Sequence, residues 1–252
     1  MIPQKNKEHN KEMKISEKIM MDIKGLEENG PINIVICGDS VSHGAFNGYM
    51  DYENVYWNVL KKKMYAFRDF VPINMINVSI GGTVAKSALG RFDRQVLIHQ
   101  PDLVIICFGL NDVNGHLESY LDSLRAMFEK CNAAGVDAIF MTPNMLNTRV
   151  ADDAPKEYYN YAIKTADMQN NGKMDQFMTE AVALAKSMNI TVCDCYSKWK
   201  ELSKTQDVTM LLCNRINHPT EEMHLLFADS LYKVILGDTE GEKSNESTMY
   251  KE

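Results

Sequence analysis

Residues 32–40 read Ile-Asn-Ile-Val-Ile-Cys-Gly-Asp-Ser, and this stretch decides the fold of the chain. Its first six residues are mostly apolar and rich in β-branched side chains, as is typical of a strand buried on both faces of a sheet. Gly38 ends the strand, and Asp39 and Ser40 open a polar turn. The stretch therefore predicts an inner strand of a parallel sheet, followed by a tight loop that presents a hydroxyl group.

The same pattern recurs along the rest of the sequence. Apolar runs alternate with stretches of helical periodicity, and this alternation predicts right-handed βαβ units with helices on both faces of a parallel sheet. We expect an α/β fold of three layers, α/β/α, around a five-stranded parallel sheet of flavodoxin-like order. The further strands are predicted at 73–78, 103–108, 136–141 and 190–193, and the helices at 53–68, 84–99, 117–134, 155–188 and 220–235.

The chain divides into one domain and two polar ends. Residues 1–30 are charged, with apolar side chains at roughly helical spacing, which predicts an N-terminal helical extension packed on the main domain. Residues 31–237 form the predicted domain, and residues 238–252 form a polar C-terminal tail. A chain of 252 residues is long enough to bury a core without metals or disulfides.

The composition of the chain argues against several kinds of binding partner. The net charge of −7 disfavours a nucleic-acid partner, because nucleic-acid binders usually carry a basic patch. No apolar run is long enough to span a membrane, and the N-terminus lacks a secretory pattern, so we expect a cytoplasmic protein without a membrane partner. Cys193 and Cys195 are separated by one residue, which is shorter than the usual spacing of structural zinc ligands. We therefore expect neither a metal site nor a cofactor.

Polar and glycine-rich clusters follow the predicted strands and precede the last helix. They lie at 38–44, 77–83, 109–112 and 214–219. Ligands of such sheets bind beyond the carboxyl ends of the strands, where these clusters meet. A serine after a strand can act as nucleophile, a histidine from a neighbouring loop as its base, and backbone N–H groups or an asparagine amide as donors to an oxyanion. The clusters together predict acyl-transfer chemistry.

These clusters resemble the sequence blocks of the SGNH/GDSL hydrolase family, whose bacterial members include esterases and lipases. Gly38-Asp39-Ser40 is similar to the first block, and Gly82 stands where the second block has its oxyanion glycine. Gly109-Leu-Asn111-Asp112 is similar to the third block, and His218-Pro219 to the last. The resemblance implies the SGNH hydrolase fold, Ser40 as nucleophile and His218 as base. It also implies an oxyanion hole made by the N–H groups of Ser40 and Gly82 with the Asn111 amide.

One position departs from the family pattern. The family usually has an aspartate three residues before the histidine, and this chain has Arg215. In a first explanation a neutral acceptor orients His218, either the Asn214 side chain or a backbone carbonyl, and we count Asn214 among the predicted catalytic residues. In a second explanation Asp194 or Asp207 folds in as a distant carboxylate. A third possibility is that the protein has reduced activity, since loss of the aspartate that orients the histidine can lower the rate by up to about 10⁴-fold.

Several neighbours of these residues have less direct roles. We expect Asp39 and Asp112 to brace their loops, and His43 to support the nucleophile loop rather than act as the base. Three aromatic residues follow that loop and fit an aromatic wall for a sugar: Tyr49, Tyr52 and Trp57. Helix packing explains Trp57 equally well.

The family resemblance covers lipases, thioesterases, lysophospholipases and carbohydrate deacetylases. The chain most resembles the compact bacterial SGNH esterases, and no long apolar lid segment for fatty acyl chains is evident. We therefore expect an esterase that hydrolyses small acyl esters, acetyl in the first place, on a carbohydrate. The partner would be a small-molecule or glycan ester. A short-chain thioesterase or lysophospholipase is the alternative within enzymes. A catalytically silent ligand-binding module is the alternative from another class, and the oligomeric state stays open.

Overall fold

A computed structural model of the protein describes residues 15–237. The predicted tail, 238–252, and the first half of the predicted extension lie outside the described residues. In the described half of the extension, the single expected helix is replaced by two short ones, α1 (Ile15–Ile19) and α2 (Ile23–Asn29), because Asp22 caps the second by accepting the Gly25 N–H. Ile15, Ile19 and Leu26 are buried in the common core, so these helices pack on the main domain as expected.

The sheet has the predicted five parallel strands. Their order across the sheet is β2-β1-β3-β4-β5, the flavodoxin-like order. The central strand β3 has no residue more than 1% exposed, which explains its continuous apolar sequence. The strands are β1 (Ile32–Gly38), β2 (Ile73–Asn77), β3 (Leu103–Cys107), β4 (Asp137–Met141) and β5 (Thr191–Cys193).

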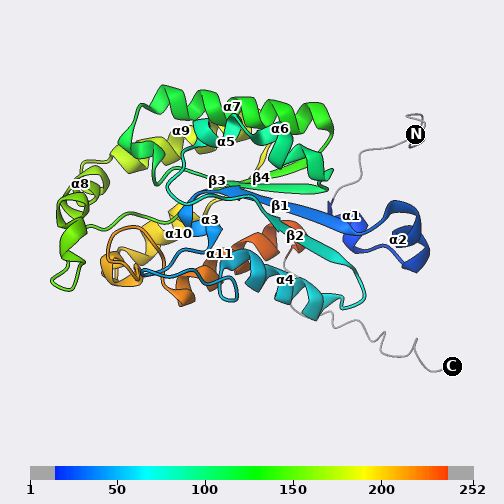
Figure 1. Ribbon diagram of the computed structural model, residues 1–252, viewed down its shortest axis with the longest axis horizontal. Coiled ribbons are helices and arrows are strands. Elements are labelled where there is room, and N and C mark those ends of the chain that lie inside the picture. Colours follow the sequence, from blue (N-terminus) through cyan, green and yellow to red (C-terminus); the bar gives the residue numbers. More distant parts are fainter. Residues whose placement is uncertain (1–14, 238–252) are drawn as a thin grey trace.

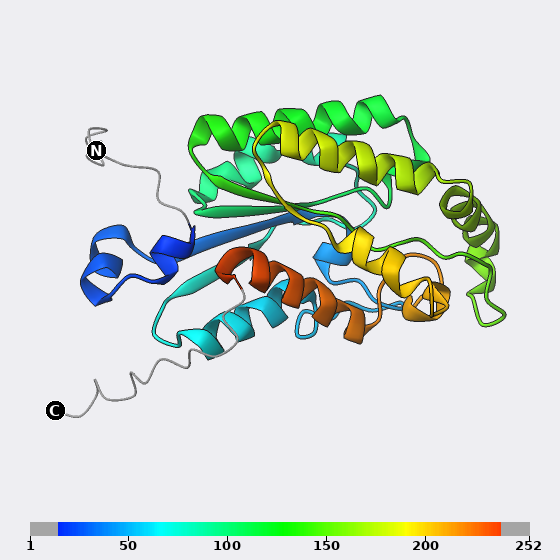
Figure 2. The same cartoon turned by 180° about the vertical axis from the view of Figure 1, so that it is seen from behind.

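Helices cover both faces of this sheet, which confirms the three-layer prediction (Figures 1 and 2). One face carries α5 (Ala85–Leu89), α6 (Phe92–Gln95), α7 (Leu117–Ala134) and α9 (Lys173–Ser187). The other face carries α4 (Tyr56–Phe67), α10 (Cys195–Leu202) and α11 (Glu221–Leu236). No helix among residues 15–237 is long and apolar enough to cross a membrane.

Two of the predicted helices, 84–99 and 155–188, are interrupted. Residues 84–99 form α5, α6 and the short η1 (Leu97–His99), because α5 ends at Gly90. Residues 155–188 form η3 (Lys156–Tyr158), α8 (Tyr159–Asn170) and α9, with Gly172 in a left-handed conformation at the break. Four elements were not predicted: α3 (Ser40–His43), η2 (Asp112–Asn114), α10 and η4 (Val208–Leu211). Three of them are single turns, which are too short to show a helical period, whereas α10 has eight residues and was missed.

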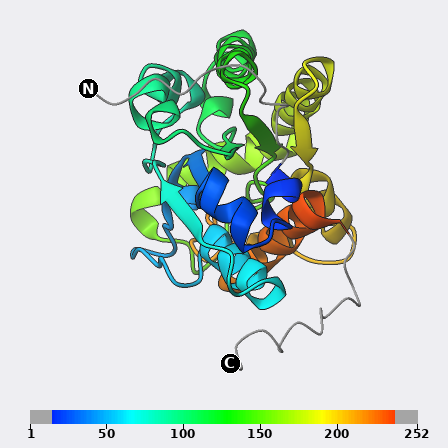
Figure 3. The ribbon, with the colours of Figure 1, turned by 90° about the vertical axis from the view of Figure 1, so that its right-hand side faces the viewer.

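The two ends of the sheet differ. At the carboxyl end, α3 follows β1 directly and α8 lies beyond the strands (Figure 1). The helices α1 and α2 lie at the opposite, amino end, where Figure 3 shows them in front of the sheet. The loops that carry the predicted site residues therefore gather at the carboxyl end, away from the N-terminal helices.

Candidate active site

The nucleophile turn is built by three consecutive residues, Gly38, Asp39 and Ser40. Asp39 caps α3, and its Oδ1 accepts the Val41 N–H at 3.1 Å. This cap places Ser40 at the first position of α3, immediately beyond the end of β1. A Cβ on Gly38 would lie 2.8 Å from the Cys107 carbonyl oxygen of the neighbouring strand, so only glycine fits there. The local sequence thus fixes a half-buried hydroxyl at the carboxyl end of the sheet.

The Ser40 hydroxyl meets the His218 imidazole. Oγ of Ser40 lies 2.9 Å from Nε2 of His218, although the two residues are 178 positions apart in the chain. Burial lowers the pKa of His218 below its ordinary value, which keeps the ring neutral and able to accept a proton. This pair has the geometry of an activated nucleophile and its general base.

A backbone carbonyl orients the imidazole. Nδ1 of His218 lies 2.8 Å from the carbonyl oxygen of Phe46. Since a carbonyl can only accept, Nδ1 carries the hydrogen, and Nε2 keeps its lone pair for Ser40. The Phe46 ring is buried and packs on His224 of α11 with ring centroids 4.7 Å apart. The carbonyl is therefore held in place by the core beneath it.

Asn214 does not have the predicted orienting role. Its Oδ1 accepts three backbone N–H groups, those of Ile216, Asn217 and His218, at 2.9–3.0 Å. Its Nδ2 donates to the Asn217 side chain, so the amide is used inside the turn that leads to His218. The structure thus corrects the prediction: of the two neutral acceptors considered, the backbone carbonyl contacts the ring, and Asn214 shapes the turn as Asx residues do.

The explanation by a distant carboxylate is also wrong. Asp194 caps α10 and Asp207 caps η4, and both are engaged there. Arg215 has a left-handed φ of 61° and directs its guanidinium to Asp153, at 2.9–3.1 Å. The residue at the usual aspartate position therefore ties two loops together and leaves the Nδ1 side of His218 to the carbonyl.

The predicted oxyanion donors come from the nucleophile turn and from two neighbouring loops that contact each other. Among residues 15–237, the N–H groups of Ser40 and Gly82 have no acceptor. Asn111 donates one amide hydrogen to the Thr83 carbonyl at 3.0 Å, which leaves the second for a ligand. A Cβ on Gly81 would lie 3.6 Å from the Ser40 Cβ, so the glycine turn lies against the nucleophile. Gly82 has a φ of +75°, a conformation that favours glycine. The arrangement fits the predicted oxyanion hole, and that role stays a prediction.

This geometry agrees with a family model. The GDSL-like lipase/acylhydrolase family matches residues 36–226, which include the predicted nucleophile, the oxyanion residues and the histidine. The chain belongs to the GDSL-like lipase/acylhydrolase family. It is therefore a serine hydrolase that acts on ester bonds.

Two curated relatives match parts of this acylhydrolase. An acetylxylan esterase of Geobacillus stearothermophilus is 22% identical over 175 residues, which cover 65% of this chain and 72% of that enzyme. The uncharacterized lipoprotein YqeF of Bacillus subtilis (strain 168) is 30% identical over 128 residues, which cover 47% of this chain and 51% of that protein.

Solved structures of the family share the fold. The crystal structure of the acetylxylan esterase Axe2 from Geobacillus stearothermophilus has a TM-score of 0.64 at 21% identity, covering 81% of this chain and 94% of that one. A putative GDSL-like lipase from Parabacteroides merdae has a TM-score of 0.64 at 18% identity, covering 82% and 95% of the two chains. At this identity the likeness concerns the fold, and it places the sheet and its helices in the same class.

His43 supports the glycine turn, in keeping with its expected secondary role. Its Nδ1 accepts the Gly81 N–H at 3.1 Å and so connects the end of α3 to the turn that contains Gly82. His43 has no contact with the His218 ring among the described residues. It is a positioning residue for the oxyanion turn.

Replacing His43 by alanine should lower kcat by about five- to tenfold, because one hydrogen bond of about 1 kcal/mol no longer holds the turn. Replacing it by asparagine should restore most of kcat, since Oδ1 of asparagine can accept the same N–H. Steady-state kinetics with p-nitrophenyl acetate would compare the variants. Equal activity in the wild-type and alanine proteins, or equal loss in both variants, would contradict the role.

Two buried aspartates lie beside the site and have structural contacts. Asp39 caps the nucleophile helix, and Asp112 accepts the Ala85 N–H at 2.8 Å. Burial raises the pKa of Asp39 to about 7 and that of Asp112 to about 6. No hydrogen bond joins either carboxyl group to Ser40 or His218 among the described residues. Both residues brace their loops, as the sequence suggested.

The pKa of His218 gives a prediction for the pH profile. Protonated His218 cannot accept the Ser40 proton, so kcat/KM should fall as the pH falls through the His218 pKa. Because burial lowers this pKa below 6.5, the acidic limb should have its midpoint below 6.5. Measuring kcat/KM for p-nitrophenyl acetate between pH 4 and pH 9 tests this. A midpoint above 6.5 would indicate a carboxylate that stabilises the imidazolium, contrary to the observed carbonyl contact.

A cavity of about 520 Å³ adjoins His218. Residues of three segments line it: 45–50, 155–161 and 214–218. The first segment follows the nucleophile helix, the second leads into α8, and the third contains the predicted base. The cavity therefore lies where a substrate group attached to the reacting ester could extend.

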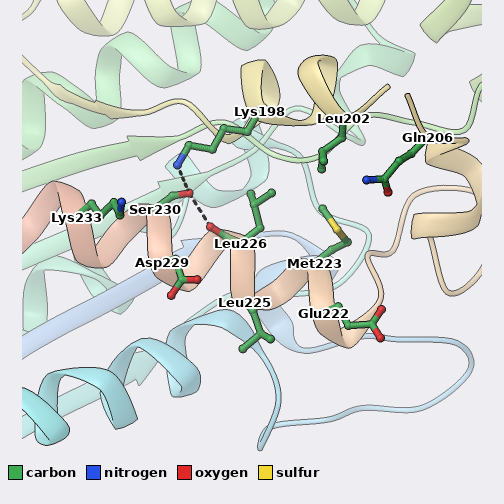
Figure 4. A pocket seen from close by; sticks show the side chains of 10 residues that line it. All are labelled: Lys198, Leu202, Gln206, Glu222, Met223, Leu225, Leu226, Asp229, Ser230 and Lys233. Carbon is green, nitrogen blue, oxygen red and sulfur yellow. Dashed lines mark hydrogen bonds between the residues drawn. The ribbon is translucent and has the colours of Figure 1, made fainter. Parts of the chain in front are cut away.

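A second cavity, of about 530 Å³, lies between α10 and α11 and contains none of the predicted site residues (Figure 4). There the Lys198 ammonium donates to Ser230 Oγ at 2.6 Å, and that hydroxyl donates to the Leu226 carbonyl at 2.6 Å. Because its proton is directed at a carbonyl of its own helix, Ser230 is not arranged as a nucleophile. Among residues 15–237, no group of three or more His, Cys, Asp or Glu could hold a metal ion.

Proposed function

We propose that this acylhydrolase removes small acyl groups, in the first place acetyl, from a carbohydrate. The observation that carries the chemistry is the 2.9 Å contact between Ser40 Oγ and His218 Nε2, with the other ring nitrogen on the Phe46 carbonyl. Two findings support the choice of substrate: the similarity to acetylxylan esterase, and the tyrosine and asparagine residues that line the cavity beside His218.

The reaction proceeds in two halves. Ser40 Oγ attacks the ester carbonyl carbon while His218 Nε2 takes its proton, and the carbonyl oxygen becomes an oxyanion facing the N–H groups of Ser40 and Gly82 and the free hydrogen of the Asn111 amide. The intermediate collapses, His218 returns the proton to the departing alcohol, and Ser40 keeps the acyl group. Water then attacks the acyl-enzyme, with His218 again as base, and releases the acid.

The Phe46 carbonyl affects how well this dyad works. It fixes the Nδ1–H tautomer that the reaction needs, so the enzyme avoids the loss that a wrong tautomer causes. A neutral carbonyl stabilises the transient imidazolium less than a carboxylate does. This geometry favours a working esterase over a silent module.

The cavity favours an uncharged leaving group. Among residues 15–237, the lining contains no lysine or arginine, and its only acidic residue is Glu157. Lysophospholipids and nucleotide-linked thioesters carry phosphate groups, which proteins usually bind with arginine, lysine or clustered N–H groups. The lining therefore gives no support to the thioesterase and lysophospholipase alternatives.

Comparing p-nitrophenyl acetate with p-nitrophenyl octanoate tests the acyl preference, and acetate release from acetylated xylo-oligosaccharides tests the carbohydrate. We expect kcat/KM to be at least about tenfold higher for the acetyl ester. The Ser40→Ala protein gives the background rate. A preference for the octanoyl ester would overturn the small-acyl proposal, and absence of acetate release from every acetylated sugar tried would overturn the carbohydrate proposal.

The cytoplasmic location stays a prediction. One relative is named a lipoprotein, which points to the alternative of a surface location. Fractionation of the native organism with an antibody against this chain would decide: recovery in the membrane fraction would contradict the prediction.

A further inference from the structure

The cavity beside His218 has a wall of exposed aromatic side chains. Tyr49 is 58% exposed and Tyr158 is 55% exposed, and both line the cavity together with Tyr161. Large aromatic side chains bind ligands well because they combine an apolar face with a hydroxyl that can hydrogen-bond. A sugar ring has the complementary pattern, with C–H groups on its faces and hydroxyls around its edge.

One of these rings is held in place. The Tyr49 ring stacks on the buried Phe46 ring with centroids 5.7 Å apart and planes 14° apart. Phe46 is also the residue whose backbone carbonyl orients His218, so one residue supports both the aromatic wall, through its ring, and the catalytic base, through its carbonyl. A ligand that stacks on Tyr49 is thereby held at a defined position relative to His218.

Polar groups and charge in the cavity suit an uncharged ligand rich in hydroxyls. The Asn47 side chain is exposed and has no partner among residues 15–237, so its amide is free to bind a ligand. Of the described residues that line the cavity, Glu157 is the only one with a formal charge, since burial lowers the pKa of His218 and so favours its neutral form. A carboxylate, sulfate or phosphate on the ligand would meet this negative charge without a compensating cation.

We propose that this cavity is the leaving-group subsite, that it holds an uncharged sugar ring against Tyr49 and Tyr158, and that Glu157 discriminates against anionic sugars. This inference deepens the proposed function and rests on it. It specifies which residues bind the sugar and that the preferred sugar is uncharged.

Neighbouring tyrosines provide a matched test. Tyr158 lines the cavity, whereas Tyr159, which is 51% exposed, does not. Tyr158→Ala should raise KM for acetate release from acetylated xylo-oligosaccharides about tenfold, with a smaller effect on kcat. The reason is that the sugar ring loses the tyrosine ring on which it stacks and the apolar contact area that this ring provides. Tyr159→Ala should change KM by less than about twofold. An unchanged KM in Tyr158→Ala, or an equal rise in both variants, would overturn the subsite.

Binding without turnover separates this inference from the proposed function. Calorimetric titration of the Ser40→Ala protein with acetylated xylo-oligosaccharide should give a Kd that rises about tenfold when Tyr158→Ala is added and that Tyr159→Ala leaves unchanged. Failure of wild-type protein to hydrolyse p-nitrophenyl acetate would refute the esterase, whatever the titration shows. A Kd that is insensitive to Tyr158→Ala in an active esterase would refute the subsite alone.

The charge selectivity has its own comparison. Acetylated glucose should be a better substrate than acetylated glucuronate by at least about tenfold in kcat/KM, and Glu157→Gln should reduce that ratio. Equal or better use of the glucuronate ester by the wild-type enzyme would overturn the assignment of Glu157.

Discussion

Replacing Ser40 by alanine lowers kcat for ester hydrolysis by about 10⁴–10⁶-fold, because the reaction loses the atom that carries the acyl group. The fold should be unaffected, since the only partner of the Ser40 side chain among residues 15–237 is His218. Steady-state kinetics on p-nitrophenyl acetate, with thermal unfolding as the control for folding, measure both effects. Substantial activity in Ser40→Ala would refute the nucleophile.

His218→Ala should lose a similar factor, and the double variant should be hardly worse than either single one. The effects of substituting residues that act as a unit are strongly non-additive, because the second substitution acts on a dyad that the first has already inactivated. If the two losses multiply instead, Ser40 and His218 act independently and the 2.9 Å contact has no catalytic meaning.

Replacing Asn111 by alanine should lower kcat by about 10²–10³-fold with a small effect on KM, the usual scale for one lost oxyanion donor. The amide hydrogen not used by the Thr83 carbonyl would otherwise stabilise charge that appears only in the transition state. Kinetics with p-nitrophenyl acetate give kcat and KM separately. A rise in KM at unchanged kcat would show that Asn111 binds the substrate and is not an oxyanion donor.

Asn114 offers a matched control at the end of η2, the short helix that Asn111 precedes. Its side chain donates to the Asn111 carbonyl at 3.2 Å and is exposed. Asn114→Ala removes an asparagine amide three residues after Asn111, and this amide is not a predicted oxyanion donor. The kcat of this variant should therefore stay within about twofold of wild type. A loss as large as that of Asn111→Ala would indicate general damage to the loop.

The sheet could be predicted from the sequence because its strands are short apolar runs that begin and end at clear polar or glycine positions. The helices were predicted less well where their periodicity continued across a break, as at Gly90 and Gly172. A single glycine inside a periodic stretch is tolerated in many helices, so the sequence alone does not show that the helix ends there. The four-residue α3 escaped prediction for the opposite reason, since one turn has no period.

The site was predictable where residue type carries the chemistry. The structure brings Ser40 and His218 together, and Gly82 and Asn111 lie at the turns predicted for them. A backbone carbonyl was one of the two predicted orienting groups, but the residue that supplies it was not predictable, because every residue has a backbone carbonyl and the identity of Phe46 says nothing about where its oxygen points. Asn214 had the right residue type for an orienter, yet its oxygen is occupied by three N–H groups of its own turn.

Only part of the aromatic wall beside His218 could be predicted from the sequence. Tyr49 follows the nucleophile loop and lines the cavity, whereas Tyr158 comes from a segment 109 positions later that only the fold brings there. Tyr52 is not among the described residues that line the cavity. Trp57, a third aromatic residue after the nucleophile, donates its Nε1–H to the Ser42 carbonyl at 2.9 Å. It packs against the nucleophile helix and does not line the cavity.

We expect His218 to activate the Ser40 hydroxyl without a carboxylate partner. Labelling the folded protein with a fluorophosphonate and locating the adduct by peptide mass spectrometry tests it most directly. We predict one adduct per chain, located on Ser40. It should form as fast at pH 7 as at higher pH, and it should not form in the His218→Ala protein. Absence of labelling in the folded wild-type protein, or an adduct on another serine, would contradict it.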